Sequence, residues 1–122
     1  MPTHSLTQLM IVQPNQTAEF LGSGLLPVLA TPALIAFMEN TAMQLIELPE
    51  GSSSVGTSIS IKHLKATPIH AKIECTATIT NIDGRKYTFT IQAADSVGDI
   101  IGEATHERVI VNIERFMQKL DQ

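Results

Sequence analysis

Residues 31–47 constrain the fold more than any other part of the chain. Thr31 is a candidate N-cap, Pro32 suits the first helical position, and no further Pro occurs before Pro49. The helix predicted here has an almost fully apolar surface. One side of one small sheet cannot cover such a surface. We therefore expect a sheet that curls around the helix and a second copy of the chain that buries the remainder.

Most of the remaining sequence predicts strands. In residues 69–82 apolar and polar side chains alternate, and residues 85–96 repeat the pattern, which is typical of a sheet with one wet face. Further strands are predicted at 6–13, 55–64 and 99–112, a short helix at 113–120, an irregular connection at 17–30 and a linker at 51–54. We expect a three-residue loop with a left-handed Gly84 that pairs Ile79 with Tyr87.

This order of elements predicts an α+β fold. One strand, one long helix and four antiparallel strands give the hotdog arrangement, a curled five-stranded sheet around the helix at 31–47. The length of 122 residues fits one domain, so residues 1–122 are taken as a single unit. We expect a homodimer, with a tetramer as the alternative.

Composition and charge exclude several classes of function. A net charge of −4 with 8 Lys and Arg lacks the basic surface that nucleic acid requires. Cys75 is the only cysteine, so an intrachain disulfide and a multi-cysteine zinc site are excluded. Residues 1–8 show neither the basic region nor the apolar core of a secretory signal, so we expect none, and no apolar stretch reaches the roughly 20 residues of a membrane span. A cytoplasmic protein with no membrane partner is expected.

Packing alone does not explain the predicted positions of Glu39 and His63. Glu39 lies between apolar positions on the predicted helix, where desolvation would prepare a carboxylate for acid, base or nucleophilic work. His63 shares strand parity with Val55, Thr57, Ile59 and Ile61 and should point inward with them. A Glu and a His that both point inward match acid-base chemistry if they pair, although a glutamate that reaches water and a satisfied core histidine are the structural alternatives.

The other candidates are explained without chemistry. Thr31 alone reads as a helix cap, Cys75 as a small core residue, and His106 lies in a strand that alternates poorly. Neither metal-binding motifs nor phosphate-cradling glycine fingerprints occur, so no metal and no cofactor are predicted.

Three segments together resemble a known family. ATPALIAFMENTA at 30–42, VGTSISIKHL at 55–64 and GEATHERVIV at 102–111 are similar to the fluoroacetyl-CoA thioesterase-like family of hotdog proteins. The resemblance implies a dimeric enzyme that cleaves short acyl-CoA thioesters, with coenzyme A as part of the substrate. It assigns the catalytic roles to Thr31, Glu39 and His63, and implies that Gly56 lets the backbone approach the thioester.

The implied reaction is attack on a thioester carbonyl by Glu39 directly or by water that Glu39 activates, with His63 managing protons for the thiolate. Arg108 is a candidate contact for the CoA phosphates, as are Lys62, Lys65, Arg85 and Lys86. Segment 23–28 lacks the aromatic residue of some fluoroacetyl-specific members. A pocket of Leu25, Leu26, Val28 and Met43 would therefore accept short or branched acyl groups generally.

Two other functions remain open from the sequence. A hotdog enzyme such as an enoyl-thioester hydratase would also use an inward His with a carboxylate, although its usual helix-borne histidine is missing. A non-catalytic module that binds acyl-CoA or another small ligand would use Glu39 and His63 as a structural pair.

Overall fold

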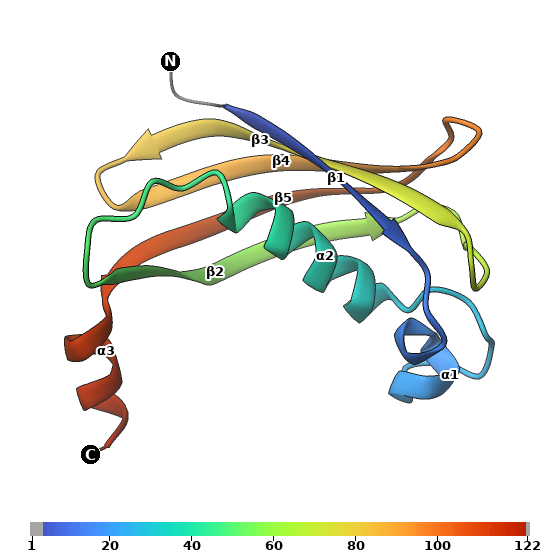
Figure 1. Ribbon diagram of the computed structural model, residues 1–122, viewed down its shortest axis with the longest axis horizontal. Helices are drawn as coiled ribbons and strands as arrows, with labels where there is room; N and C mark the ends of the chain where they lie inside the picture. The colour runs from blue at the N-terminus through green and yellow to red at the C-terminus, as the bar shows by residue number, and fades with distance from the viewer. Residues whose placement is uncertain (1–3, 122) are drawn as a thin grey trace.

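The computed structural model describes residues 4–121. Its elements are β1 (Ser5–Ile11), the 3-10 helix η1 (Pro14–Gln16), α1 (Ala18–Leu21), α2 (Thr31–Met43), β2 (Ser52–His63), β3 (Lys72–Asp83), β4 (Lys86–Asp95), β5 (Ile100–Asn112) and α3 (Ile113–Leu120). The strands form one antiparallel sheet in the order β1-β3-β4-β5-β2 with α2 beneath it (Figure 1). This is the predicted hotdog fold. Within residues 4–121 no helix is long and apolar enough to span a membrane.

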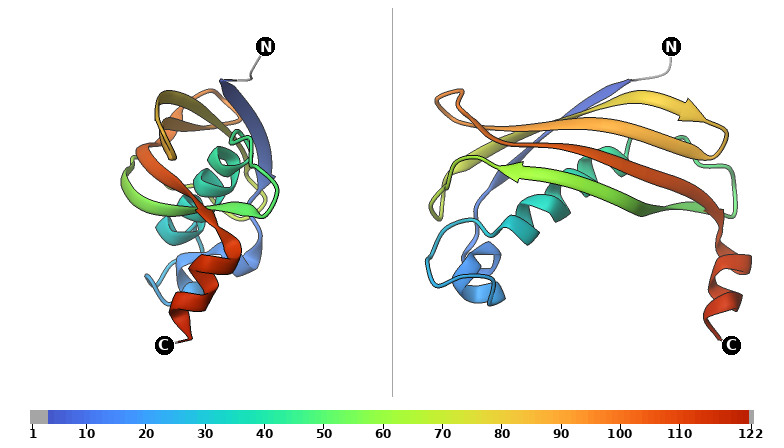
Figure 2. Two further views of the ribbon diagram at one scale, coloured as in Figure 1. Left: turned by 90° about the vertical axis from the view of Figure 1, so that its left-hand side faces the viewer. Right: turned by 180° about the vertical axis from the view of Figure 1, so that it is seen from behind.

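The core lies between α2 and the concave face of the sheet, which curves over the helix in both views of Figure 2. Leu34, Met38 and Ala42 lie on one side of α2, one turn apart, and are fully buried. The sheet contributes the predicted alternating positions, among them Ile73, Cys75, Ala77, Phe89, Ile91 and Ala93. These contacts fix which helix face looks at the sheet, and therefore which face is left uncovered.

The β3–β4 hairpin differs from its prediction. Asp83 pairs with Lys86 around a two-residue turn that contains the left-handed Gly84, and Ile79 pairs with Phe89 rather than Tyr87. A bulge at Thr80 inserts the extra residue that the parity argument required. The common apolar face is thus restored inside the strand and not in the loop.

A second bulge lies in β2 and decides what faces the helix. Gly56 pairs with Arg108 and Ser58 with Glu107, so Thr57 is the extra residue. The expected single parity from Val55 to His63 is therefore wrong: Ile59, Ile61 and His63 face α2, whereas Val55 and Thr57 do not share their side. Gly56 falls on the helix side instead. The strand also begins at Ser52, within the predicted linker.

Helix α2 ends at Met43, four residues before its predicted end. The chain tightens after it, with Leu45 N–H bonding to Ala42 O and Ile46 N–H to Met43 O. This turn places Leu45 and Ile46 in the core. Segment 17–30, predicted as irregular, contains the single-turn helix α1, which Thr17 caps by accepting a hydrogen bond from Phe20 N.

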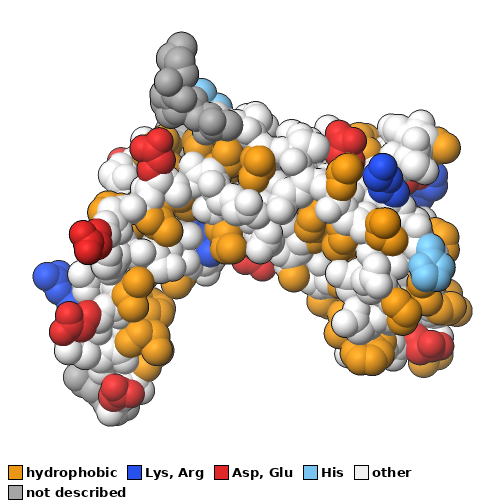
Figure 3. Space-filling model, in the orientation of Figure 1, with side chains coloured by type: hydrophobic (Ala, Val, Ile, Leu, Met, Phe, Trp, Pro, Cys, Tyr) orange, Lys and Arg blue, Asp and Glu red, His pale blue; other side chains and the backbone are white. Residues whose placement is uncertain are grey.

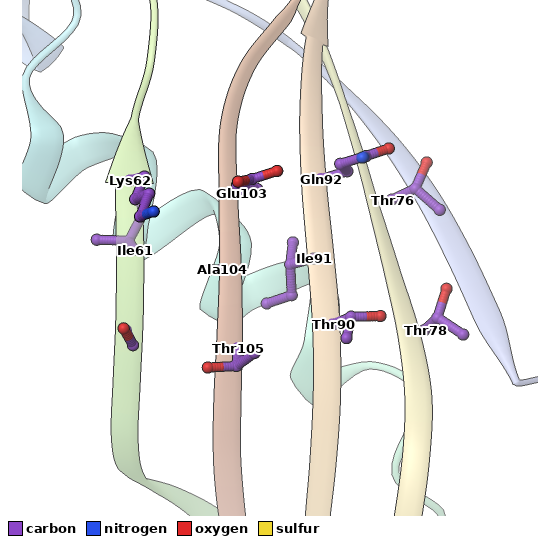
Figure 4. A pocket seen from close by; sticks show the side chains of 11 residues that line it. Ile61, Lys62, Thr76, Thr78, Thr90, Ile91, Gln92, Glu103, Ala104 and Thr105 are labelled. Carbon is purple, nitrogen blue, oxygen red and sulfur yellow. The ribbon is translucent and has the colours of Figure 1, made fainter.

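The face of the sheet away from α2 is polar. A shallow hollow of about 510 Å³ lies on this face. Figure 4 shows side chains that line it, which include Ser60, Lys62, Thr76, Thr78, Thr90, Gln92, Glu103 and Thr105. None of the predicted catalytic residues lines this hollow. Thr31 and Glu39 lie on α2 instead, and His63 lies at the end of β2.

Candidate functional site

Thr31 and His63 meet at the start of α2. Thr31 Oγ1 lies 2.8 Å from His63 Nδ1, a hydrogen bond that joins the helix to the end of β2. The predicted capping role of Thr31 is wrong. Ala30 is the N-cap, no side chain caps the helix, and Thr31 is already a helical residue whose hydroxyl is turned toward the histidine. The pair borders a hollow of about 290 Å³ that Val28, Leu29 and Ala66 also line.

The surroundings of His63 determine the charge of its ring. Burial lowers the pKa of His63 below its usual 6.5, so the imidazole is neutral at neutral pH. Its Nε2 atom is buried and has no hydrogen-bond partner among residues 4–121. A buried polar atom without a partner is uncommon in folded proteins. Nδ1 is thus the ring nitrogen that bonds to Thr31, and Nε2 is the one left without a hydrogen-bond partner in this part of the chain.

Glu39 occupies the middle of α2 and faces the start of β2. Its Oε2 lies 3.7 Å from Arg108 Nη1 and 3.9 Å from His106 Nε2, while 37% of its side chain stays exposed. The predicted desolvation is therefore incomplete in a single chain. The reason is that Glu39 lies on the face of α2 that the chain's own sheet does not cover.

The contacts of His106 define its tautomer. Nδ1 lies 2.8 Å from Ser58 O, and a carbonyl only accepts, so Nδ1 carries the proton. Nε2 lies 3.3 Å from Arg108 Nη1, and a guanidinium only donates, so Nε2 is the unprotonated acceptor. Burial also lowers the pKa of His106. The ring is neutral, and the positive charge next to Glu39 is that of Arg108.

Arg108 is itself held in one place. Its Nε donates to Ser54 Oγ at 2.9 Å and its Nη2 to Ser54 O at 3.1 Å. Only 7% of the residue is exposed. Arg108 was predicted to contact the CoA phosphates, but its guanidinium points into the protein toward Glu39 and not to solvent. The geometry instead makes it a fixed cation beneath the carboxylate.

Gly56 provides the floor of this cluster. A Cβ atom built on it would lie 2.7 Å from Glu39 Oε2 and 3.2 Å from His106 Cε1. Both distances are shorter than van der Waals contact, so any larger residue displaces the carboxylate. The absence of a side chain at Gly56 is thus required by Glu39, in addition to the approach of the thioester that the resemblance implies.

Gly56→Ala is expected to fold normally and to lose at least tenfold in kcat, because the flexible end of Glu39 moves away cheaply but leaves its place beside Arg108. Thermal unfolding and thioester hydrolysis measure the two effects separately. The control is Ser58→Ala, because Ser58 is an exposed residue of the same strand. Gly51→Ala does not serve as the control, because the backbone at Gly51 has a positive φ that alanine would adopt only with strain. An unchanged kcat in Gly56→Ala would remove the glycine from the site.

The buried histidines also predict how stability depends on pH. Burial lowers the pKa of both His63 and His106 in the folded protein. Near pH 6.5 the unfolded chain therefore binds protons at these histidines that the folded protein does not bind. The urea midpoint should therefore fall between about pH 7 and pH 5.5. His106→Gln should flatten this slope. A midpoint that rises over this range would contradict the neutral assignment.

Glu39 and His63 do not form the predicted pair within one chain. Thr31 and Glu39 are separated by about 12 Å along the axis of α2, as expected for eight residues of helix. Gly56 and His63 are separated by about 20 Å of extended strand. One chain therefore carries two half-sites, Thr31 with His63 and Glu39 with Arg108 and His106.

The remaining predicted residues are dispersed. Leu25 is 91% exposed, and neither it nor Leu26 lines the hollow beside Thr31, whereas Val28 does. Met43 is exposed one turn beyond Glu39. Lys65 is held by Asp95 and Asp99, and Lys86 lies 3.2 Å from Glu107. Within residues 4–121 no three His, Cys, Asp or Glu side chains gather as a metal site.

Sequence reasoning missed His106 as a site residue. Its strand alternates poorly because a bulge at Ile101 precedes the regular stretch of Ala104, His106 and Arg108, all of which are buried. The signal was available in this stretch: two polar residues follow Ala104 on the same parity, the side that faces the helix.

Comparison with known proteins gives a consistent result. The family described as fluoroacetyl-CoA-specific thioesterase matches residues 12–114. The fluoroacetyl-CoA thioesterase of Streptantibioticus cattleyicolor is 31% identical over 123 residues, which cover 99% of this chain and 84% of that protein. These matches span nearly the whole chain, including both half-sites.

Solved structures agree with this result. The fluoroacetyl-CoA thioesterase FlK is 30% identical, with a TM-score of 0.93 over 100% of this chain and 96% of that one. A variant of FlK in complex with fluoroacetate and CoA is 30% identical, with a TM-score of 0.85 over 95% of this chain and 99% of that one. From its sequence, its fold and its relatives, the chain belongs to the fluoroacetyl-CoA-specific thioesterase family of hotdog hydrolases that act on acyl-CoA thioesters.

Proposed function

We propose that the protein hydrolyses a short or branched acyl-CoA thioester in a site shared by two subunits. Glu39 of one subunit would work with Thr31 and His63 of the other. The observation that carries this proposal is the position of the half-sites: both border β2, one at Gly56 and the other at His63. Two copies of this strand side by side would bring unlike halves together.

Strand β2 is suited to such pairing. It is an edge of the sheet with 12 residues, and a long exposed edge offers unpaired N–H and C=O groups to another strand. Antiparallel pairing of two copies, centred between Ile59 and Ser60, sets Gly56 beside His63 of the partner subunit. The apolar residues around Glu39 on α2, Ile35, Ala36 and Met43, are not fully buried, and a second subunit would cover them.

In this arrangement the reaction needs no cofactor. Glu39 attacks the thioester carbonyl carbon and forms an anhydride that water then hydrolyses, or it takes a proton from a water molecule that attacks the carbonyl carbon itself. The C–S bond breaks, Nε2–H of the partner's His63 donates a proton to the departing thiolate, and a proton released by the water restores the neutral ring. The hydroxyl of Thr31 holds the ring of His63 in orientation through Nδ1. The products are a carboxylic acid and free coenzyme A.

Arg108 and His106 act as positioning residues. The fixed guanidinium, 3.7 Å from the Glu39 carboxylate, holds it aimed along β2 by charge attraction. The neutral His106 accepts from Arg108 and so restrains the guanidinium in turn. Closure of the site by the second subunit would remove water and strengthen these interactions.

The acyl group is proposed to enter the hollow beside Thr31 and His63. The residues that line this hollow are small or aliphatic, among them Ala18, Val28, Leu29 and Ala66. FlK is a relative solved with fluoroacetate and CoA, which supports a CoA thioester as the substrate here. Segment 23–28 carries no aromatic residue, so we propose short or branched acyl groups rather than fluoroacetyl alone. The cytoplasm is the proposed compartment.

The test is a panel of acyl-CoA thioesters of increasing chain length and branching, fluoroacetyl-CoA included, with release of free thiol as the readout. Hydrolysis of short aliphatic members supports the proposal. Tight binding without thiol release would indicate a binding module. Addition of water to an enoyl-CoA without thiol release would indicate a hydratase.

Thr31→Val tests the threonine, because valine keeps the shape but cannot hydrogen-bond to His63. We expect kcat to fall about tenfold or more, together with a stability loss of about 1 kcal/mol, at temperatures where the variant is fully folded. Thr31→Ser keeps the hydroxyl and should retain most of the activity. If valine and serine turn over equally well, the hydroxyl has no role in the reaction.

A further inference from the structure

Helix α3 presents an apolar face that no other element within residues 4–121 fully covers. Ile113, Phe116, Met117 and Leu120 are spaced along one side of it, and all four are exposed. Its polar residues Glu114, Arg115, Gln118 and Lys119 follow the other side. An eight-residue helix is too short to persist without packing. We therefore expect another protein surface to pack against the apolar face of α3.

A second exposed apolar cluster lies at the other end of the molecule. Phe20 and Leu21 of α1 and Leu25 and Leu26 of the following loop are all exposed. In Figure 1, α1 and α3 both hang beyond the β2 edge, at opposite ends of the sheet. Figure 3 shows apolar side chains on the side of α3 that faces the space beneath the sheet, and more of them on the α1 end. A two-fold rotation about the β2 edge exchanges the ends and sets unlike clusters face to face.

The direction of the strands gives the same result. The antiparallel pairing that sets Gly56 beside His63 of the partner subunit also brings the start of β2, at Ser52, to the loop that follows His63 of the partner subunit. Helix α3 begins next to the start of β2, because the N–H of its first residue, Ile113, donates to Gly51 O at 3.0 Å. Pro68 forms a bridge with Val28, which lines the hollow beside Thr31 and His63. In the dimer, each α3 thus lies next to the loop that lines the acyl hollow of the other subunit.

We propose that the apolar face of α3 packs on Leu25 and Leu26 of the partner subunit and closes the acyl hollow, so that the C-terminal helix of one subunit limits the length of acyl chain that the other accepts. This inference rests on the dimer of the proposed function and extends it. It also gives Leu25 a place in the substrate pocket, which it lacks in a single chain. The occupant of both apolar surfaces is a second copy of the chain.

Cysteine pairs test the contact in the intact protein. Phe116→Cys or Met117→Cys, each combined with Leu25→Cys or Leu26→Cys, should form a disulfide between subunits under mild oxidation, seen as a dimer-sized band without reductant. The only native cysteine, Cys75, is buried and does not interfere. Gln118→Cys on the polar side of α3, combined with Leu25→Cys, is the matched control. A monomer-sized disulfide, or none in any pair, would overturn the proposal because something other than a second copy would cover the face.

The consequence for substrates is tested separately. Phe116→Ala with Met117→Ala should shift the acyl-chain optimum toward longer chains or raise KM for short ones at least fivefold, whereas Lys119→Ala should do neither. Light scattering, which reports the oligomeric state, distinguishes a failure of the shared site from a failure of the role proposed for α3. A monomeric wild-type protein would overturn the shared site itself. A dimer without cross-links and with an unchanged chain-length profile would overturn only the role of α3.

Discussion

Replacing Glu39 with Gln is expected to lower kcat for acyl-CoA hydrolysis by a factor of about 10² to 10⁴. The amide keeps the shape of the side chain but is neither a base nor a nucleophile. Arg108 loses the carboxylate 3.7 Å from it but keeps both hydrogen bonds to Ser54, so the fold should persist. Hydrolysis rates give the first effect, and thermal unfolding with CoA-binding measurements gives the second.

Glu47→Gln is the matched control for this experiment. Glu47 is an exposed glutamate shortly after the end of α2, away from Arg108 and His106. The control should retain wild-type turnover. Full activity in Glu39→Gln with an intact fold would return Glu39 to a structural role and leave the reaction without its carboxylate.

The fold was predictable because its strongest signals are local and periodic. Alternation in the segments around Cys75 and Phe89 identifies one wet and one buried face, and the helix-start signals at Pro32 locate α2 within one residue. These patterns record burial directly, since each inward position must be apolar to fill the core. They do not depend on which strands become neighbours.

The exact register was not predictable for the opposite reason. The bulges at Thr57 and Thr80 each add one residue to a strand without a distinctive composition. One such residue exchanges the faces of everything before it. This is why Gly56 faces Glu39 while Val55 does not, and why the hairpin at Gly84 has two residues in its turn and not three.

The candidate site was only half visible from the sequence. Glu39 and His63 were identified because a charged or titratable group at an inward position is anomalous. Their partners are distant in sequence: Arg108 and His106 reach Glu39 only through the pairing of β5 with β2, and Thr31 reaches His63 from another element. No pattern along one chain indicates that the two halves lie apart.

Mixing two inactive variants tests whether the halves combine across subunits. In a shared site, a Glu39→Gln subunit still supplies Thr31 and His63, and a His63→Asn subunit still supplies Glu39. Each dimer with one subunit of each kind then holds one complete site and one that lacks both groups. Each variant alone has two damaged sites. Subunits are exchanged by refolding the two variants together, with a mass tag on one to count mixed dimers.

A wild-type chain mixed with a chain that carries both substitutions is the control. Its mixed dimers have no complete site if the halves are shared, and one complete site if each chain holds its own. The wild-type homodimers in this control stay active, so about one quarter of wild-type activity should remain if the halves are shared and about one half if each chain holds its own site. Protein concentration and refolding yield affect both mixtures equally.

Recovery of thioesterase activity in the mixture of Glu39→Gln with His63→Asn is the most direct measure of the shared site. Random pairing makes half of the dimers mixed with one of two sites intact, so about one quarter of wild-type activity should return. Activity no higher than the average of the two separate variants, in a sample where mixed dimers are counted, would show that Glu39 and His63 do not act together across the subunit interface.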